Sequence, residues 1–267
     1  MSDNAPTRPP SRRRVALVTG AGGRTINIGA AVARRLAETG WDVAFTYWRP
    51  YDDDKPWAPE PEAPAALGRE LAGLGARCTA VEADLADPAV PATVFDAAEH
   101  DLGPVHALVM CHCEQRDLNL LTTTVESFDR HFAVNARAPW LLIREFGRRF
   151  AGAADDSDPG RIIAFTGDHV VGNLPYGASK GALDRITLAA AHEFAALGVR
   201  ANVINPGPVD TGWMTDEVRP SGSDRTPAGR LAGPEEPANL VAFLCSPQGQ
   251  WINGQLLYSN GGFRTAL

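Results

Sequence analysis

The sequence has no long apolar run, little cysteine and no excess of positive charge, and each absence excludes a class of protein. No segment is apolar for long enough to span a bilayer, and the polar start lacks the apolar stretch of a signal peptide. The 4 cysteines are too few to suggest a disulfide framework, so we expect reduced thiols and a cytoplasmic location. A net charge of −7 argues against nucleic-acid or anionic-membrane partners.

What is present is the composition of a globular protein. Hydrophobic residues make up 44% and charged residues 21% of the chain, as in ordinary folded domains. A length of 267 residues fits one large domain with ample core. We expect a disordered basic leader over 1–13 and a single domain over 14–267, with an inserted surface loop at 50–64 that is rich in proline and acid.

Short apolar runs alternate with segments of helical periodicity along the whole chain. This alternation predicts an α/β fold, a single doubly wound Rossmann domain in which helices cover both faces of a seven-stranded, mostly parallel sheet. A helical stretch at 125–150 is expected to break near Pro139. Another expected helix begins at 28, and the remaining ones cover 65–74, 88–100, 176–197 and 237–245. The expected strands are 15–18, 42–47, 77–82, 106–110, 161–165, 199–204 and 255–258.

A glycine-rich turn joins the first expected strand to the first expected helix. It reads Thr19-Gly20-Ala21-Gly22-Gly23. Glycines permit a tight turn, and the free N–H groups of a helix N-terminus attract a pyrophosphate. A glycine-rich turn without a ligand is the alternative, but the strand before it and the helix after it favour a dinucleotide site.

The end of the second expected strand carries no carboxylate. Folds that select NAD place an acid there, which binds the ribose 2′-hydroxyl. Here the strand ends at Tyr47, followed by Trp48 and Arg49, and a second arginine, Arg24, lies in the glycine loop. Two guanidiniums suit a 2′-phosphate, so we expect NADP(H), although either arginine could simply be solvated.

Tyr176 and Lys180 lie four residues apart, on one face of an expected helix. A nearby ammonium favours phenolate and lowers the pKa of a tyrosine, which could then exchange a proton with a substrate oxygen or nitrogen. A surface pair is the common explanation of such spacing, so the rest of the chain has to decide between the two.

Several motifs, in this order along the chain, resemble those of the short-chain dehydrogenase/reductase family, and the resemblance covers roughly 14–263. Together they are far more specific than any one of them. They are the glycine loop, Asp84-Leu85, Val134-Asn135-Ala136, Tyr176-x-x-x-Lys180, Asn205-Pro206-Gly207-Pro208-Val209-Asp210-Thr211, and the terminal Gly254-Gln255 and Gly261-Gly262.

The resemblance implies hydride transfer between a nicotinamide and a small-molecule substrate, with Tyr176 as acid or base. Lys180 would lower the pKa of Tyr176 and bind the nicotinamide ribose. Asn135 would hold a water in a proton relay, although a helix-bending role is its alternative. A homotetramer or homodimer is also implied. The expected cofactor-binding residues are Gly20, Gly22, Arg24, Thr25, Ile28, Gly29, Tyr47, Arg49, Asp84, Leu85, Cys111, Tyr176, Lys180, Pro206, Gly207, Val209 and Thr211.

Two departures from the family pattern lie near the expected cofactor. The glycine loop is three residues longer than usual and has Asn27 at the middle glycine position, where we expect asparagine to tolerate a left-handed backbone. Lengthened loops resemble the enoyl-reductase branch, but that branch spaces its tyrosine and lysine seven apart, so enoyl reduction is disfavoured. The family's Asn-Asn-Ala-Gly reads Met110-Cys111-His112-Cys113. Three consecutive residues of an extended chain cannot all face one ion, so we expect no metal.

A third departure removes the serine that accompanies the family's tyrosine. Aligned on the fifth expected strand, its position falls on Gly167, and the nearest hydroxyl is that of Thr166. Three explanations compete. Thr166 or His169 supplies the missing donor to a carbonyl; or the substrate is an imine, iminium ion or carbinolamine beside Asp168; or catalysis is lost and the chain is an NADPH-binding sensor or partner protein. A solvated turn is the plain alternative for Asp168 and His169.

The segment after Thr211 is expected to contact the substrate. Trp213 and Met214 are the candidates, and 211–232 reads as a mobile lid. Core or interface packing would explain Trp213 equally well.

Overall fold

The computed structural model describes residues 13–55, 60–150, 159–169, 171–212 and 223–263. Its centre is one sheet of seven strands in the order β3-β2-β1-β4-β5-β6-β7, and every pair of neighbours is parallel. The prediction of a doubly wound parallel sheet is therefore confirmed. The strands are β1 (Arg14–Thr19), β2 (Trp41–Tyr47), β3 (Cys78–Glu82), β4 (Val105–Met110), β5 (Gly160–Phe165), β6 (Val199–Asn205) and β7 (Leu256–Tyr258).

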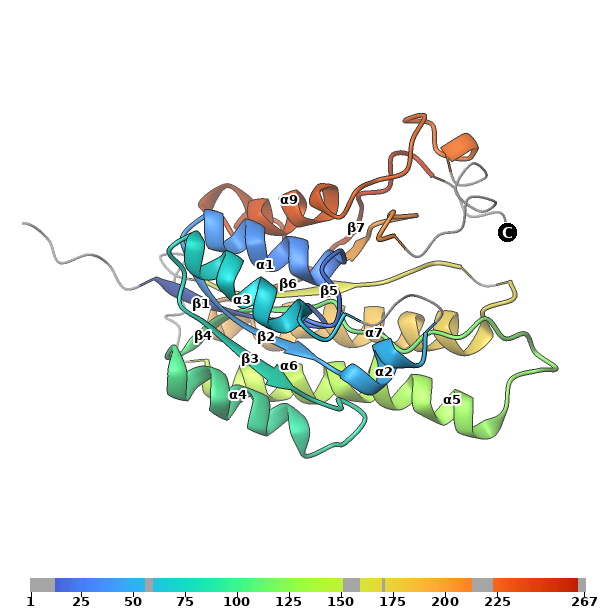
Figure 1. The fold of residues 1–267 in the computed structure, drawn as a ribbon, viewed down its shortest axis with the longest axis horizontal. Coiled ribbons are helices and arrows are strands. Elements are labelled where there is room, and N and C mark those ends of the chain that lie inside the picture. Colours follow the sequence, from blue (N-terminus) through green and yellow to red (C-terminus); the bar gives the residue numbers. More distant parts are fainter. Residues whose placement is uncertain (1–12, 56–59, 151–158, 170, 213–222, 264–267) are drawn as a thin grey trace, which may run out of the picture.

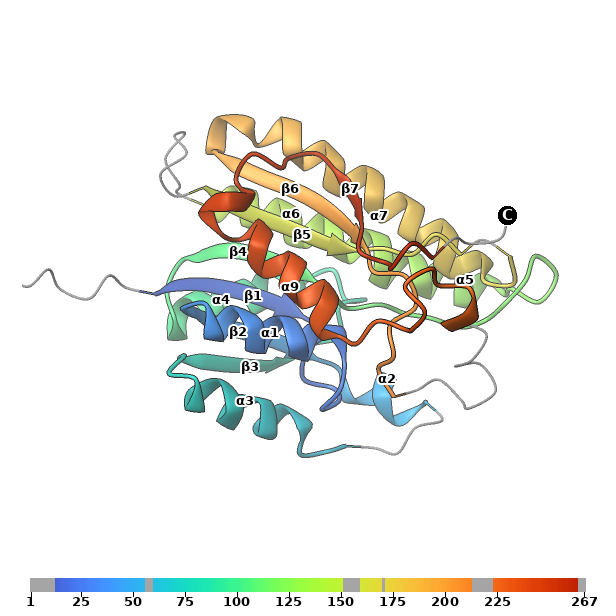
Figure 2. The ribbon, with the colours of Figure 1, turned by 90° about the horizontal axis from the view of Figure 1, so that it is seen from above.

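Helices cover both faces of this sheet (Figures 1 and 2). On one face lie α1 (Ile28–Glu38), α3 (Ala63–Gly73) and α9 (Glu235–Leu244). On the other face lie α4 (Val90–Asp101), α5 (Val125–Phe132), α6 (Ala138–Arg149) and α7 (Leu174–Glu193). Short helical turns complete the described elements: α2 (Arg49–Asp53), the π-helical η1 (Ala133–Arg137), and the 3₁₀ turns η2 (Ala195–Leu197) and η3 (Pro247–Gly249).

The central strands are apolar on both sides because helices pack against both sides. Alternate residues of β1 show this directly. Leu17 packs into the cluster beneath α4, α6 and α7, where Phe95 and Phe146 are fully buried. Val18 packs into the opposite cluster, beneath α1, α3 and α9, together with Leu36.

The expected break near Pro139 takes the form of the π-helical turn η1, which ends just before that proline. Pro139 is in the first turn of α6, where a missing N–H is tolerated. In an uninterrupted α-helix its nitrogen would have to bond the carbonyl of Asn135, which proline cannot do. The π-helical turn at 133–137 absorbs this conflict immediately before α6.

Two other boundaries differ from expectation. Arg13 is not part of a disordered leader, because its guanidinium donates to the carbonyls of Gly75 and Ala37, both at 2.6 Å; residues 1–12 lie outside the described part. The 50–64 segment is not only a loop, because its residues 50–53 belong to α2. Within the expected lid, 213–222 lie outside the described residues, and Ala232 pairs with Val209. Among the described helices, none has the length and apolarity needed to cross a membrane.

Candidate active site

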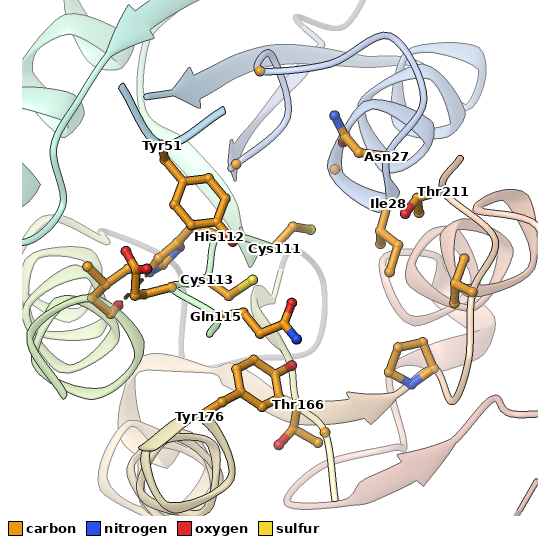
Figure 3. Close-up of a pocket in the computed structure, with 18 of the residues that line it drawn as sticks. Asn27, Ile28, Tyr51, Cys111, His112, Cys113, Gln115, Thr166, Tyr176 and Thr211 are labelled. Carbon is orange, nitrogen blue, oxygen red and sulfur yellow. Dashed lines mark hydrogen bonds between the residues drawn. The ribbon is translucent and has the colours of Figure 1, made fainter. Parts of the chain in front are cut away.

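A cavity of about 830 Å³ opens where the parallel strands end at their carboxyl side (Figure 3). Its walls come from the loops after β1, β2, β3, β4, β5 and β6, and from the start of α7. This is the usual place for a ligand in an open α/β sheet, where the connections diverge to opposite faces. The volume lies within the range typical of small-molecule and cofactor sites.

The glycine loop is held in place by close backbone packing. Gly20 has a φ of +69°, and a Cβ there would lie 2.7 Å from the backbone of His112. Gly29 packs α1 against the strand, since a Cβ there would lie 2.5 Å from the carbonyl oxygen of Gly20. Both positions therefore require glycine, one for its backbone angle and the other for close approach.

Asn27 corrects the expectation of a left-handed residue. Its φ is −160°, which is extended backbone, and it serves as the N-cap of α1. Its Oδ1 accepts the N–H of Ala30 at 2.7 Å, while its Nδ2 donates to the carbonyls of Ala21 and Arg24 at 3.1 and 2.8 Å. The side chain thus closes the lengthened loop on itself and caps the helix behind it.

Tyr176 and Lys180 lie together at the start of α7, as their spacing predicts. The Lys180 ammonium is 5.6 Å from the centroid of the Tyr176 ring and donates to the carbonyl of Phe165 at 2.8 Å. Desolvation lowers the pKa of Lys180 and, joined by the nearby Cys113, Asp184 and Asp168, raises that of Tyr176. The expected lowering of the Tyr176 pKa is therefore not seen, and the phenol stays protonated at neutral pH.

Gly167 occupies the place beside the phenol where the family's serine was sought. A Cβ built on Gly167 would lie 3.1 Å from the Tyr176 hydroxyl oxygen. The Thr166 hydroxyl is turned away from that oxygen (Figure 3) and lies beside the carboxyl of Asp184, whose pKa burial raises and Thr166 lowers. Strand side chains alternate between faces, and Thr166 Oγ1 is buried without a hydrogen-bond partner in the described part of the chain. The role of Thr166 as the missing donor stays a prediction.

Asn135 joins the end of β4 to α7. Its Oδ1 accepts the N–H of Glu114 at 2.7 Å, and its Nδ2 donates to the Glu114 carbonyl at 2.8 Å and to the Ser179 hydroxyl at 2.9 Å. Both polar atoms of the side chain are therefore engaged by protein. A water held by Asn135 would have to use its backbone carbonyl, which Pro139 cannot bond.

His112 is a positioning residue that the sequence did not reveal. Its Nε2 lies 3.1 Å from the carbonyl of Val134, and its Nδ1 lies 2.6 Å from the hydroxyl of Thr19. Because a carbonyl can only accept, Nε2 carries the proton and Thr19 donates to Nδ1. Desolvation, with the Lys180 ammonium as a smaller cause, lowers the pKa of His112 to about 3, so the neutral ring links β1, β4 and η1.

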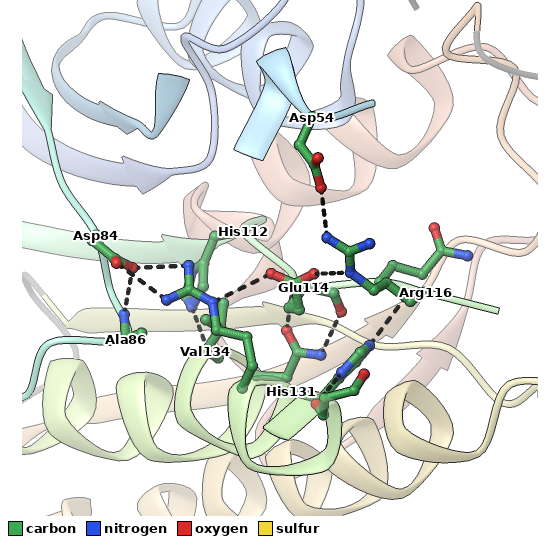
Figure 4. Close-up of polar contacts among 12 residues, drawn as sticks. Asp54, Asp84, Ala86, His112, Glu114, Arg116, His131 and Val134 are labelled. Carbon is green, nitrogen blue, oxygen red and sulfur yellow. Dashed lines mark hydrogen bonds and ion pairs between the residues drawn. The ribbon is translucent and has the colours of Figure 1, made fainter. Parts of the chain in front are cut away.

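An ion-pair network connects Asp84, in the loop after β3, with Glu114 and Arg116 (Figure 4). Arg130 of α5 contacts both carboxylate oxygens of Asp84 at 3.1 Å and reaches Glu114 at 3.4 Å. Glu114 also lies 3.7 Å from Arg116, which pairs with Asp54 of the insertion at 2.5 Å. Asp84 was expected to bind adenine; Arg130, which also lines the cavity, was not anticipated from the sequence.

The insertion after β2 reaches into the cavity. The ring of Tyr51 projects toward Cys113 (Figure 3), and Lys55 lies 4.0 Å from the centroid of this ring while it donates to the Gln115 carbonyl at 2.9 Å. The Asp52 carboxylate lies against Gly23, where a Cβ would be 2.0 Å from it. Burial raises the pKa of Asp52 to about 6.

The structure brings most of the predicted residues together, with clear exceptions. Asn135 and Lys180 stand behind the cavity wall, and Arg49 pairs with Asp53 at 2.6 Å and lines a separate small pocket. Gly22 packs on Phe45. Thr25 does not line the cavity and contacts Glu60. Trp213 and Met214 lie outside the described residues. The predicted residues that line the cavity are Gly20, Arg24, Ile28, Gly29, Tyr47, Asp84, Leu85, Cys111, Thr166, Asp168, His169, Tyr176, Pro206, Gly207, Val209 and Thr211.

The cavity fits a dinucleotide in shape and in chemistry. Gly20 and Gly29 leave a cradle that side chains would fill, and the side chain of Asn205 presents a buried Nδ2 with no partner among the described residues. A buried donor of this kind calls for an acceptor on a ligand. His112 points away from its neighbours Cys111 and Cys113, and no cluster of three metal-ligating side chains occurs in the described part of the chain.

Comparison with known proteins agrees with this geometry. A family model described as "Enoyl-(Acyl carrier protein) reductase" matches residues 23–264. The chain belongs to the short-chain dehydrogenase/reductase family. An uncharacterized oxidoreductase of Bacillus subtilis, YjdA, is 37% identical over 95% of this chain and 98% of its own length. An NADPH-dependent aldehyde reductase-like protein of Arabidopsis thaliana is 32% identical over 95% of each.

Solved structures of this family superpose closely. A dehydrogenase/reductase from Sinorhizobium meliloti has a TM-score of 0.81 at 32% identity, over 93% of this chain and 94% of its own. A blue fluorescent protein from a metagenomic library, solved in complex with NADPH, has a TM-score of 0.80 at 34% identity, over 94% and 97%.

Proposed function

We propose that this short-chain dehydrogenase/reductase uses NADPH to reduce a C=O or C=N group of a small molecule, with Tyr176 as the acid. The observation that carries this proposal is the position of Tyr176, which faces the same cavity as the glycine loop. The chain is an NADP-dependent oxidoreductase, and its similarity to an NADPH-dependent aldehyde reductase-like protein and to a structure with bound NADPH supports that cofactor.

Different residues of the chain would bind different parts of the cofactor. Gly20, Gly29 and the first turn of α1 would receive the diphosphate, and Asp84 and Leu85 would receive the adenine. Thr211 and the loop after β6 would hold the nicotinamide end. When bound, the cofactor supplies the hydride.

Proton transfer falls to Tyr176. Its phenol is protonated at neutral pH, because desolvation raises its pKa, and a protonated phenol is the form that can give a proton to a substrate being reduced. Lys180 lies one turn away with its ammonium fixed on the Phe165 carbonyl. Asn135 keeps the β4 loop and α7 in register through its three side-chain hydrogen bonds.

The substrate meets a site that has no hydroxyl at 167. An oxyanion that develops on a carbonyl substrate would lack a hydrogen-bond donor there, and such a donor typically stabilises the transition state by about 3 kcal/mol. A C=N nitrogen takes a proton more readily than a carbonyl oxygen, so Tyr176 would give its proton to this nitrogen. The resulting iminium charge would be stabilised by the Asp168 carboxylate, which lies close enough to raise the pKa of Tyr176. This combination favours C=N over unactivated C=O reduction within the proposed activity.

The test is NADPH oxidation with paired panels of ketones and cyclic imines. Tyr176→Phe should abolish turnover of every substrate and leave NADPH affinity nearly unchanged. The matched control is Tyr258→Phe on β7, a tyrosine that does not line the cavity; this variant should turn over normally. Retained activity in Tyr176→Phe would refute the acid assignment. Micromolar NADPH binding without turnover of any substrate would instead favour a sensor or partner protein.

We also propose that the protein is a homodimer or homotetramer. The edge of the sheet supports this, because Trp251, Leu256 and Tyr258 at and near β7 are 91%, 36% and 57% exposed. Apolar patches on a sheet edge are usual at interfaces between subunits. Light scattering on the eluting protein would measure the mass, and a monomer would contradict the proposal.

A further inference from the structure

The carboxylate of Glu60 sits on the apex of the glycine loop. Its Oε2 accepts the backbone N–H of Thr25 at 2.8 Å and also the hydroxyl of Thr25 in a short hydrogen bond. Its Oε1 lies 3.7 Å from Nε of Arg24. Two donors from one residue and a guanidinium from its neighbour therefore converge on a single anionic group that comes from the insertion.

These are the donors by which proteins bind phosphate. Backbone N–H groups, hydroxyls and arginine are the usual partners of phosphate oxygens. Thr25 and Arg24 were both expected from the sequence to bind the cofactor, yet in this structure the carboxylate of Glu60 is already in contact with them. Burial alone would raise the pKa of Glu60, but the Thr25 hydrogen bonds and Arg24 together lower it, so the side chain is ionised at neutral pH.

The Arg24 guanidinium touches two parts of the fold: its Nη1 donates to the carbonyl of Thr211 at 3.1 Å, and its Nε lies 3.7 Å from Glu60. The position of Glu60 indicates which phosphate is concerned. Glu60 leads into α3, which packs beside α1 and β3, on the half of the sheet where Tyr47 and Asp84 line the cavity. That half receives the adenosine, whereas the diphosphate is expected at the first turn of α1. Arg49, the other arginine expected for the 2′-phosphate, faces a different pocket.

We propose that Glu60 occupies the binding site of the cofactor's 2′-phosphate and must leave Arg24 and Thr25 before NADPH can bind there. A carboxylate and a phosphate cannot share the same three donors, and their charges repel. Glu60 is then an internal competitor that sets the affinity for NADP and the preference over NAD. This inference rests on the NADP binding in the proposed function.

Binding of two adenosine probes tests the competition without any turnover. Adenosine 2′,5′-bisphosphate and adenosine 5′-phosphate differ only in the 2′-phosphate, and calorimetry measures their Kd values. Glu60→Gln removes the charge and keeps a side chain of the same shape. Since one partly exposed ion pair and its hydrogen bonds are lost from the competing state, the Kd of the bisphosphate should fall roughly three- to tenfold.

Glu62→Gln is the matched control, because this exposed carboxylate two residues further on makes the same change of charge away from Thr25. It should leave both Kd values unchanged, and Glu60→Gln should leave that of adenosine 5′-phosphate unchanged. An unchanged or weaker bisphosphate affinity in Glu60→Gln would overturn the competition. An equal gain for both probes would overturn the 2′-phosphate assignment. No bisphosphate binding by the unaltered chain would overturn the proposed NADP cofactor, and this inference with it.

Discussion

Replacing Gly167 by serine should return a hydroxyl to the place beside Tyr176 where the family's serine was sought. Gly167 has no positive φ, so the backbone there suits any residue. Its added Cβ would lie 3.1 Å from both Cε1 and the hydroxyl oxygen of Tyr176. The phenol must therefore yield by a few tenths of an ångström to admit any side chain at this position.

Two opposing effects set the size of the change. Crowding the Tyr176 ring costs about 1–2 kcal/mol, as is usual when a methylene is forced into a packed site. A well-placed donor to a developing oxyanion returns about 3 kcal/mol. For a ketone or aldehyde, Gly167→Ser should thus raise kcat/KM about tenfold over the unaltered enzyme, since 1.4 kcal/mol corresponds to a factor of ten.

Gly167→Ala separates the two effects, because it adds the same Cβ without the hydroxyl. It should lower kcat/KM about tenfold for every substrate. The ratio of the serine to the alanine variant should then be about a hundredfold for carbonyl substrates and close to one for cyclic imines. Steady-state NADPH oxidation measures both ratios. A serine variant no faster than the alanine variant on ketones would refute the assignment of Gly167 to the missing donor's place.

Three further changes test the surroundings of the site. His112 has a pKa of about 3 in the folded chain and an ordinary pKa when unfolded, so the free energy of unfolding should rise with pH between about 3 and 6.5. In denaturant titrations across this window, His112→Asn should reduce the slope of that free energy by about 1.4 kcal/mol per pH unit. An unchanged slope would contradict a neutral ring. The Asp52 carboxylate gains charge as the pH rises through about 6, so fluorescence titrations should show NADPH binding weaken over that range, and Asp52→Asn should remove this dependence if repulsion is its cause. Thr166→Val should leave kcat/KM within about twofold, since its hydroxyl faces away from Tyr176; a hundredfold loss would show that Thr166 is the missing donor after all.

The local pattern of the sequence was enough to predict the sheet, the glycine turn and the Tyr176–Lys180 pair. Alternating apolar runs and helical periodicity determine which faces must be buried, and parallel strands follow from the helices between them. The pair at positions 176 and 180 lies on one face of a helix whatever the tertiary fold. The same reasoning placed the missing serine at Gly167, because register along a strand is also local.

Contacts between distant parts of the chain could not be predicted in this way. Glu60 meets Thr25 across 35 residues, and His112 meets Thr19 across 93. Nothing in the composition of the 50–64 segment indicates that Tyr51 enters the cavity or that a carboxylate would sit on the glycine loop. The form of the break near Pro139 could not be predicted either, since a π-helical turn lets the proline stay inside the helical stretch.

The sequence by itself determined the fold and the family, because both depend on residue type and on spacing along single elements. The same spacing is the basis for proposing Tyr176 as the acid. Only the tertiary structure decided which side chains pair with one another and which of them line the cavity between the elements. In the folded chain the Thr166 hydroxyl lies beside Asp184, Arg49 lines a separate pocket, and Glu60 pairs with Arg24. Side-chain direction and pairing at such distances follow from packing and charge in three dimensions, which spacing along the chain does not encode.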